Sequence, residues 1–169
     1  EKTSLISKPS PAVDGGIVLV PYPSGELVAL QAKDGQTVWT ESLARLRSVS
    51  SMASLSDAAS PAIDGGIAYA VGHSGRMIAT QLRTGERLWQ LNVPSVQPPS
   101  VSGENVFVVD TTGQLLAISR REGKVLWTVK LPGASTWSGP TLAGGMLWAT
   151  SNKGQLVAVE ATTGRVTSQ

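Results

Sequence analysis

The acidic residues that could bind a metal ion stand apart from one another in this 169-residue chain, mostly beside turn glycines. A calcium site needs several carboxylate and amide oxygens close together. An aspartate at a turn usually bonds to its own backbone instead. The sequence therefore predicts no metal site and no cofactor. The aspartates concerned are Asp14, Asp34, Asp57, Asp64 and Asp110.

Residues suited to nucleophilic or acid–base catalysis are equally isolated. The chain has no cysteine, which excludes thiolate metal ligands and cysteine nucleophiles. His73 is the only histidine and falls in a Gly-His-Ser-Gly turn, so a histidine relay or a His-rich zinc site lacks its second member. No serine lies in a Gly-x-Ser-x-Gly elbow. We therefore predict that the protein has no catalytic residues and is not an enzyme.

Charge gives little indication of a nucleic-acid partner. Charged residues are 15% of the chain, and 14 Lys and Arg barely outnumber 12 Asp and Glu. Nucleic-acid binding needs basic residues concentrated on one face. The pair Arg120–Arg121 falls in a predicted hairpin and is expected to lie at the surface.

No apolar run approaches the roughly 20 residues of a membrane-spanning helix, and Glu1 is interpreted as a processed or truncated start.

The elements that must position these residues come from a unit that recurs four times. In each unit a proline is followed 14 residues later by a glycine, and 10 residues after that by a second glycine. A repeat of this size indicates an array of small supersecondary units. The sets are Pro11, Gly25, Gly35; Pro61, Gly75, Gly85; Pro99, Gly113, Gly123; and Pro140, Gly154, Gly164.

Each unit is predicted to form four short antiparallel strands joined by tight turns. In the second unit, strands over Ile67–Val71, Met77–Thr80 and Arg87–Gln90 are separated by glycine turns. The strands are nearly continuous apolar runs, which is typical of sheets that are covered on both faces. The sequence therefore predicts an all-β propeller with four-stranded blades. The blades are expected at about 9–40, 60–91, 98–129 and 139–169.

A small residue and a tryptophan recur at fixed positions. Four residues after each first glycine stands an alanine, and four residues after the second glycine stands a tryptophan, except in the last unit, which has Ser168. We predict that the unit's tryptophan, or its neighbour's, covers the alanine between blades and holds them together. The alternative is that alanine is merely tolerated there. The residues are Ala29, Ala79, Ala117 and Ala158, with Trp39, Trp89 and Trp127.

The link between the first two units, residues 41–59, is longer than the others. It is rich in serine and carries apolar residues at a spacing of three, which suggests one or two helical turns. Two interpretations remain open. The link is either a solvent loop whose apolar residues lie on the blade, or a binding loop, since long loops on rigid scaffolds often have a function.

The string Ala-x5-Gly-x3-Trp, present from Ala29 to Trp39 and twice more, resembles the tryptophan-docking motif of quinoprotein-type propellers. Leu55-Ser56-Asp57 at the end of the long link, together with Leu82-Arg83-Thr84-Gly85-Glu86-Arg87-Leu88-Trp89, is similar to the BamB family of propeller lipoproteins in the outer-membrane β-barrel assembly machine. The resemblance covers essentially the whole chain.

This resemblance implies a non-enzymatic periplasmic scaffold, lipid-anchored at the inner face of the outer membrane. It implies that rim loops bind the POTRA domains of a BamA-like barrel subunit, and that unfolded outer-membrane proteins are further partners. Carried over by position, the partner-binding residues are Leu55, Ser56 and Asp57, with Leu5 and Arg47 as weaker candidates. The chain departs from the family pattern at Ile6, where an arginine is expected, and at Ala58 and Ala59, where an acidic residue is missing.

The family propeller has eight blades, so four units correspond to half of it. We therefore expect either a fragment of a longer protein or a half that pairs with a second copy through a two-fold arrangement. The fourth unit is expected to stop before its last strand, which a partner's residues 3–7 could complete. Two other functions share such blades: a quinoprotein dehydrogenase, which would need calcium under a bound quinone, and a sensor domain of a membrane receptor.

Overall fold

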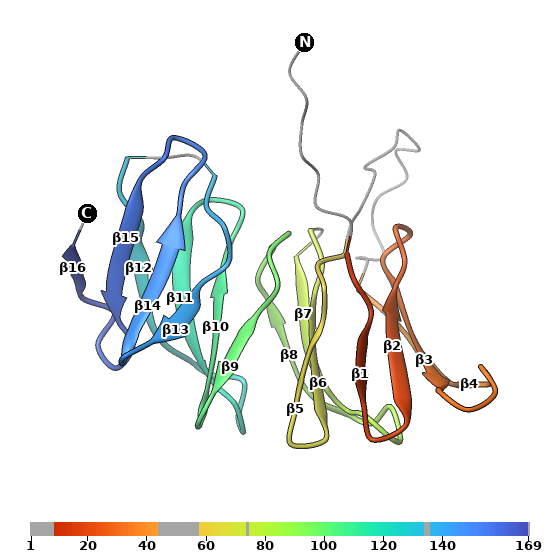
Figure 1. The fold of residues 1–169 in the computed structure, drawn as a ribbon. Coiled ribbons are helices and arrows are strands. Elements are labelled where there is room, and N and C mark those ends of the chain that lie inside the picture. Colours follow the sequence, from red (N-terminus) through yellow and green to blue (C-terminus); the bar gives the residue numbers. More distant parts are fainter. Residues whose placement is uncertain (1–8, 44–57, 74, 134–135, 169) are drawn as a thin grey trace, which may run out of the picture.

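A computed structural model describes residues 9–43, 58–73, 75–133 and 136–168, whose strands form four sheets (Figure 1). Each sheet has four antiparallel strands in chain order, so every connection within a sheet is a hairpin. The strands are β1 (Ala12–Asp14), β2 (Ile17–Pro21), β3 (Glu26–Gln31), β4 (Thr37–Ser42), β5 (Ala62–Asp64), β6 (Ile67–Val71), β7 (Arg76–Gln81), β8 (Arg87–Asn92), β9 (Ser100–Ser102), β10 (Asn105–Val109), β11 (Gln114–Ser119), β12 (Val125–Lys130), β13 (Thr141–Ala143), β14 (Met146–Thr150), β15 (Leu156–Glu160) and β16 (Val166–Ser168).

The hairpins follow from the glycines in the repeat. Between β1 and β2, Gly15 and Gly16 have φ of +53° and +80°. A two-residue hairpin with both central residues at positive φ matches the twist of the strands, and glycine adopts that conformation without steric cost. A register shift between Ala29 and Leu30 recurs at the same point in the other three sheets. The repeated sequence therefore produces the same sheet four times.

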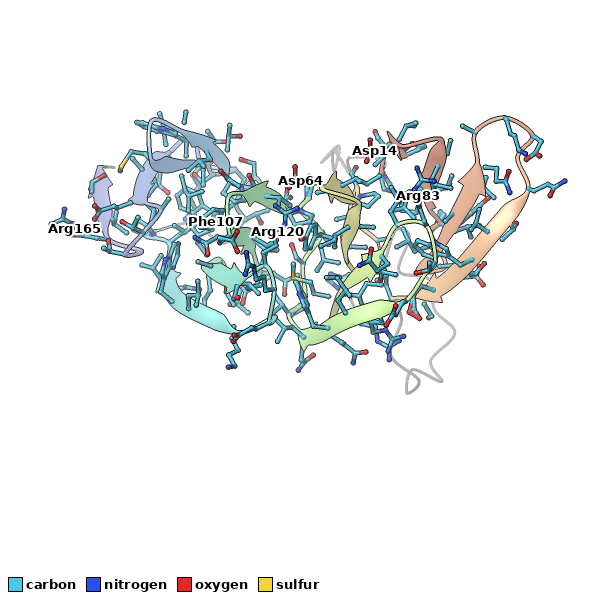
Figure 2. The ribbon with its side chains drawn as sticks, turned by 90° about the horizontal axis from the view of Figure 1, so that it is seen from below. Asp14, Asp64, Arg83, Phe107, Arg120 and Arg165 are labelled. Carbon is cyan, nitrogen blue, oxygen red and sulfur yellow. The ribbon has the colours of Figure 1, made fainter. Side chains whose placement is uncertain are left out.

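The four sheets are the blades of an open arc. The innermost strands β1, β5, β9 and β13 contact one another in succession, while β4, β8, β12 and β16 lie on the outside (Figures 1 and 2). Turns between the second and third strands of each blade lie at one end, which we call the upper rim (Figure 1). Turns between the first and second strands, and between the third and fourth, lie at the other end, the lower rim.

Burial differs between the middle and the terminal blades. All residues of β6 and β10 after the first are buried, so blades 2 and 3 are covered on both faces, as the continuous apolar runs indicated. Strand β2 instead alternates between buried and half-buried residues, and β14 alternates between buried and more accessible ones. The prediction of an all-β propeller with four-stranded antiparallel blades is confirmed.

The expectation that the fourth blade lacks its last strand is wrong. Strand β16 pairs with β15 through Ala158–Ser168 and Val159–Val166, which gives this blade four strands like the others. Three residues are enough to continue the ladder, and the missing tryptophan does not prevent pairing. The blade thus needs no strand from a partner, and residues 3–7, which were expected to supply one, lie outside the described residues.

Candidate protein-docking rim

The predicted partner-binding residues Leu5, Arg47, Leu55, Ser56 and Asp57 all lie outside the described residues. The same holds for most of the long link, including the positions that suggested a helical turn after Leu43. The structure therefore leaves their role as a prediction. It does describe the residues on both sides of the link and the surface around them.

Both ends of the long link are fixed at the upper rim. Leu43 is fully buried, and its N–H donates to the Gly25 carbonyl in the β2–β3 turn at 2.7 Å. On the other side, Ala58 forms a bridge with Gly72, and the Ala59 N–H donates to the Val71 carbonyl at 3.1 Å. The link that carries Leu55, Ser56 and Asp57 therefore begins beside the β2–β3 turn and ends beside the β6–β7 turn.

Two apolar side chains are exposed on the upper rim, where the ends of the long link are fixed. Tyr22, at the β2–β3 turn, is 43% exposed, and Val96, in the link between β8 and β9, is 40% exposed. His73, in the β6–β7 turn, is exposed, as expected for a lone turn histidine. Sequence reasoning did not identify Tyr22 or Val96, because a single apolar residue in a turn carries no periodic signal. The upper rim thus carries two exposed apolar side chains.

The loops of the upper rim are held in place by internal hydrogen bonds. In the link after β8, the buried Ser95 hydroxyl donates to the Val109 carbonyl at 2.6 Å, and the Thr111 N–H donates to the Pro94 carbonyl at 2.9 Å. In the β10–β11 turn, the Asp110 carboxylate accepts the N–H groups of Thr112 and Gln114, each at 2.8 Å. The described rim is thus a fixed surface around the base of the link.

Each tryptophan of the repeat contacts the next blade. The Trp39 indole N–H donates to the Leu82 carbonyl at 2.8 Å, and its ring lies against Gly85. The other two repeat the arrangement: Trp89 donates to the Arg120 carbonyl at 2.8 Å and lies against Gly123, and Trp127 donates to the Ala161 carbonyl at 3.2 Å and lies against Gly164.

Three of the four repeat alanines pair with the tryptophan of their own blade, and Ala158 pairs with Ser168. Ala79 lies opposite Tyr69 on one side and opposite Trp89 on the other, and the two rings have centroids 6.0 Å apart. Ala29, Ala117 and Ala158 are buried at the same position. The ring that reaches across to the next blade thus lands on its turn glycine, whereas the small alanine makes room within its own blade. How much this arrangement stabilises the protein stays a prediction.

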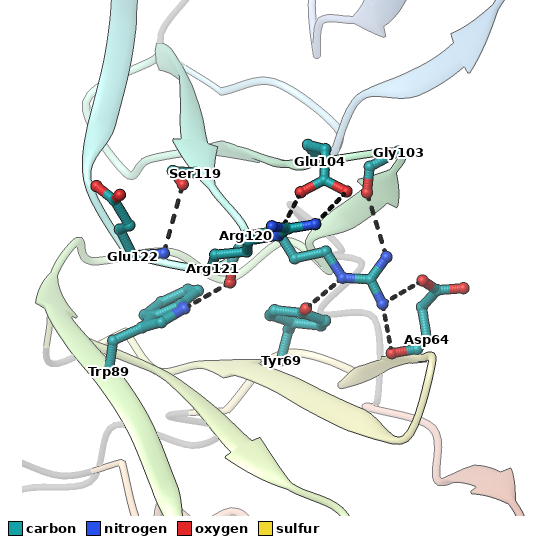
Figure 3. Close-up of polar contacts among 9 residues, drawn as sticks. All are labelled: Asp64, Tyr69, Trp89, Gly103, Glu104, Ser119, Arg120, Arg121 and Glu122. Atoms are coloured by element: carbon teal, nitrogen blue, oxygen red, sulfur yellow. Dashed lines mark hydrogen bonds and ion pairs between the residues drawn. The ribbon is translucent and has the colours of Figure 1, made fainter.

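Arg120 joins blades 2 and 3 at the lower rim, where sequence reasoning expected a surface basic pair (Figure 3). Its Nε donates to the Tyr69 hydroxyl at 2.8 Å, and one terminal nitrogen donates to the Asp64 carbonyl at 2.8 Å and pairs with the Asp64 carboxylate at 2.5 Å. Burial raises the pKa of Tyr69, and the nearby Arg120 partly offsets this effect. The expectation of a surface position was right for Arg121, which is exposed, and wrong for Arg120, which is half-buried in the junction. No feature of the sequence indicates that Arg120 reaches across to the neighbouring blade.

Three of the described aspartates serve a turn or a junction between blades. Asp34 accepts the Gln36 N–H at 3.0 Å, Asp110 holds its own turn, and Asp64 pairs with Arg120. Among the residues that the structure describes, no three His, Asp or Glu side chains gather as a metal site would require. Over the same residues, no helix has the length and apolar character needed to cross a membrane.

A comparison with protein-family models matches residues 1–129 and 120–167 to the family described as outer membrane protein assembly factor BamB. The resemblance inferred from the sequence is thereby confirmed. No curated protein sequence matches the chain.

Solved structures share the fold at low sequence identity. BamB from Moraxella catarrhalis is 23% identical with a TM-score of 0.76, and the match covers 94% of this chain and 47% of that one. The chain therefore spans about half the length of that protein. The quinohemoprotein alcohol dehydrogenase from Comamonas testosteroni is 16% identical with a TM-score of 0.74, covering 95% and 34%. The computationally designed protein Ika4 is 13% identical with a TM-score of 0.68, covering 89% and 88%.

Proposed function

The chain belongs to the family of the outer membrane protein assembly factor BamB, and from that premise we propose that it is part of a non-catalytic scaffold which binds a protein partner through its upper rim. The family match, which extends from residue 1 to residue 167, is the observation that carries this proposal. The geometry of the rim supports it. The link that bears Leu55, Ser56 and Asp57 starts and ends at fixed residues of this surface.

A rigid rim favours binding because few residues lose freedom on association. The buried anchors Leu43 and Ala58 hold the ends of the link, and the exposed Tyr22 and Val96 offer apolar contact area close to it. Aromatic side chains at the centre of an interface often carry much of the binding energy. Tyr22 is therefore added to the proposed partner-binding residues.

The proposed partner is the periplasmic POTRA region of a BamA-like barrel subunit, and the proposed location is the periplasmic side of the outer membrane, with a lipid anchor on the full-length protein. Unfolded outer-membrane proteins are proposed as further partners. The outermost strands β4, β8 and β12 each have one side without a strand partner in their sheet, and an extended segment can add to such an edge.

The test of this proposal is binding to purified POTRA domains, measured by biolayer interferometry. A Leu55→Ala, Asp57→Ala double variant is expected to bind at least about tenfold more weakly, because loss of a central contact typically costs more than about 1.4 kcal/mol. The matched control is a Leu126→Ala, Asp34→Ala double variant. It removes an exposed leucine and an exposed aspartate close to the lower rim.

Unchanged affinity of the first variant would remove the site assignment, and absence of binding by the unmodified protein would remove the scaffold function. The dehydrogenase alternative makes a different prediction, since it requires a bound quinone and calcium. The chain is only 16% identical to the alcohol dehydrogenase, so this likeness reflects the fold alone. Stoichiometric quinone or calcium in the purified protein would favour that alternative.

A further inference from the structure

The lower rim holds a pocket at the junction of blades 1 and 2. Blade 1 supplies most of its wall, and blade 2 contributes Arg83 from the β7–β8 turn. The cavity has a volume of about 680 Å³, which lies within the range of pockets that bind small molecules. The wall residues of blade 1 include Ile17, Gln31, Ala32, Lys33 and Val38.

The apolar part of this wall belongs to the core between the two blades. Ile17 is buried, Val38 is half-buried, and both pack with the buried Leu82 of blade 2. Leu82 stands three residues before the second turn glycine, where blade 3 has Arg120. At the next junction, Arg120 itself lines the corresponding pocket, which measures only about 390 Å³. The first junction therefore has the larger pocket, and a leucine lies where the second has a guanidinium.

Arg83 lines this pocket without a partner of its own. One of its terminal nitrogens lies 3.6 Å from the position of a Cβ built on Gly15, in the β1–β2 turn of blade 1. Among the residues that the structure describes, its guanidinium forms no hydrogen bond and no ion pair. Asp14 lies on the same rim but does not line the pocket (Figure 2). The pocket thus contains an arginine whose donors are available to a ligand.

The repeat explains why this arginine is unpaired. Arg121 occupies the equivalent position in blade 3 and pairs with Glu104, in the β9–β10 turn of its own blade, at 2.8 Å. The equivalent turn of blade 2 is Gly65-Gly66, which offers no carboxylate side chain. Arg83 extends toward blade 1 instead. The difference between the two junctions is therefore set by one turn residue.

Lys33 adds a second positive charge to the pocket wall. Its Nζ lies 3.7 Å from the Asp34 carboxylate, which is beyond hydrogen-bond length. We propose that the pocket binds an aliphatic monocarboxylate of the fatty-acid type, whose head group pairs with Arg83 and whose chain lies against Ile17 and Val38. A guanidinium matches the geometry of a carboxylate, and one unpaired guanidinium balances one negative charge. The inference is independent of the partner proposed for the upper rim, because the pocket lies at the opposite end of the blades.

Octanoate is the probe for this site, with acetate as the control for the chain and octanol as the control for the charge. Dissociation constants are measured by NMR titration of the isotope-labelled 169-residue protein. Octanoate is expected to bind at least about tenfold more tightly than either control, because it alone uses both the guanidinium and the apolar wall. Binding of octanol as tight as that of octanoate, or no binding of octanoate, would overturn the proposal.

Matched substitutions locate the head group. Arg83→Gln is expected to weaken octanoate binding at least about tenfold, since it removes a charge-assisted pair. Arg121→Gln is the control, because Arg121 holds the equivalent position in blade 3 and already pairs with Glu104. Both arginines are exposed, and the amide spectra of the variants verify that the fold is retained. Equal loss of affinity in the two variants would show unspecific charge attraction and would overturn the site.

A second pair of variants tests the chain contact. Val38→Ser is expected to weaken octanoate binding several-fold, because it removes apolar surface from the pocket wall. The control is Leu126→Ser, which changes the exposed residue at the equivalent position of blade 3 and should leave binding unchanged. Unchanged affinity of Val38→Ser would contradict the proposed position of the chain.

Discussion

Arg120 shows how a single side chain can connect two blades. It lies in the β11–β12 turn, and its guanidinium reaches the Tyr69 hydroxyl and the carboxylate and carbonyl of Asp64 in the neighbouring blade (Figure 3). Its backbone carbonyl also accepts the Trp89 indole N–H. Arginine suits this position because its planar group offers several donors in fixed directions. The junction between blades 2 and 3 is therefore held by polar as well as apolar contacts.

Burial of Tyr69 predicts a loss of stability at high pH. Its pKa is raised in the folded protein, so above about pH 10 the unfolded chain releases the phenol proton first. The free energy of unfolding then decreases as pH rises, by at most about 1.4 kcal/mol per pH unit for one group. Arg120, Asp64 and Glu104 are the charges that act on it. Tyr69→Phe is expected to make this decrease less steep.

The measurement is urea unfolding between about pH 9 and 11.5, comparing slopes rather than absolute stabilities, because Tyr69→Phe also removes the hydrogen bond to Arg120. Tyr22→Phe, which removes an exposed phenol, is the control. Identical slopes for the unmodified protein and Tyr69→Phe would show that the buried phenol does not govern alkaline stability.

At the scale of elements, the turn between the third and fourth strands performs two tasks. Its glycine allows positive φ, and the absence of a side chain admits the tryptophan of the preceding blade. At Gly123 a Cβ would lie 2.7 Å from the Trp89 indole, closer than real contacts allow. In the turn between the first and second strands, the second glycine performs only the first task. At Gly66, φ is +75° and nothing lies within 4 Å.

This difference predicts unequal effects of the same substitution. Gly66→Ala is expected to cost about 1–2 kcal/mol of unfolding free energy, because a residue with a Cβ is strained at positive φ. Gly123→Ala is expected to cost about 1–3 kcal/mol more, since the new methyl group also collides with the Trp89 ring. Urea unfolding of both variants measures the difference. Equal costs would show that the indole moves aside easily and that its docking contributes little.

At the scale of the whole molecule, the arc has two covered blades and two half-covered ones. Blade 4 exposes Trp148 (36%) on the face away from blade 3, at the position where Tyr69 and Phe107 are buried in blades 2 and 3. Both ends of the arc therefore present blade faces that are less covered than those of the two middle blades.

Uneven coverage predicts uneven protection from hydrogen exchange. Strands β2, β6, β10 and β14 each pair on both sides, so they have comparable backbone hydrogen bonding and differ mainly in burial. Peptides from β6 and β10 are expected to exchange at least about tenfold more slowly than those from β2 and β14, because local opening costs less where fewer apolar contacts are lost. Exchange followed by mass spectrometry at low protein concentration tests this. Equal protection of β14 and β10 would contradict it.

Local features of the chain determined the blade itself. The glycine spacing specifies the hairpins, and the strand positions agree with the structure to within one or two residues at each end, as at Ile67–Val71. The apolar runs correctly indicated strands covered on both faces in blades 2 and 3, but not in blades 1 and 4. These features depend on neighbours in the sequence, so the repeat is sufficient to reveal them. The same repeat carried the resemblance to the BamB family. It also indicated which tryptophans and alanines recur, although not which surfaces they meet.

Only the tertiary structure decided the contacts between blades, because these join residues that are distant in the chain. The reach of Arg120 to Asp64, the landing of Trp39 on Gly85, and the approach of Arg83 to Gly15 depend on how one blade is rotated against the next. No sequence pattern records that rotation. For the same reason, the tertiary structure alone places the ends of the long link, at Leu43 and Ala58, on the upper rim.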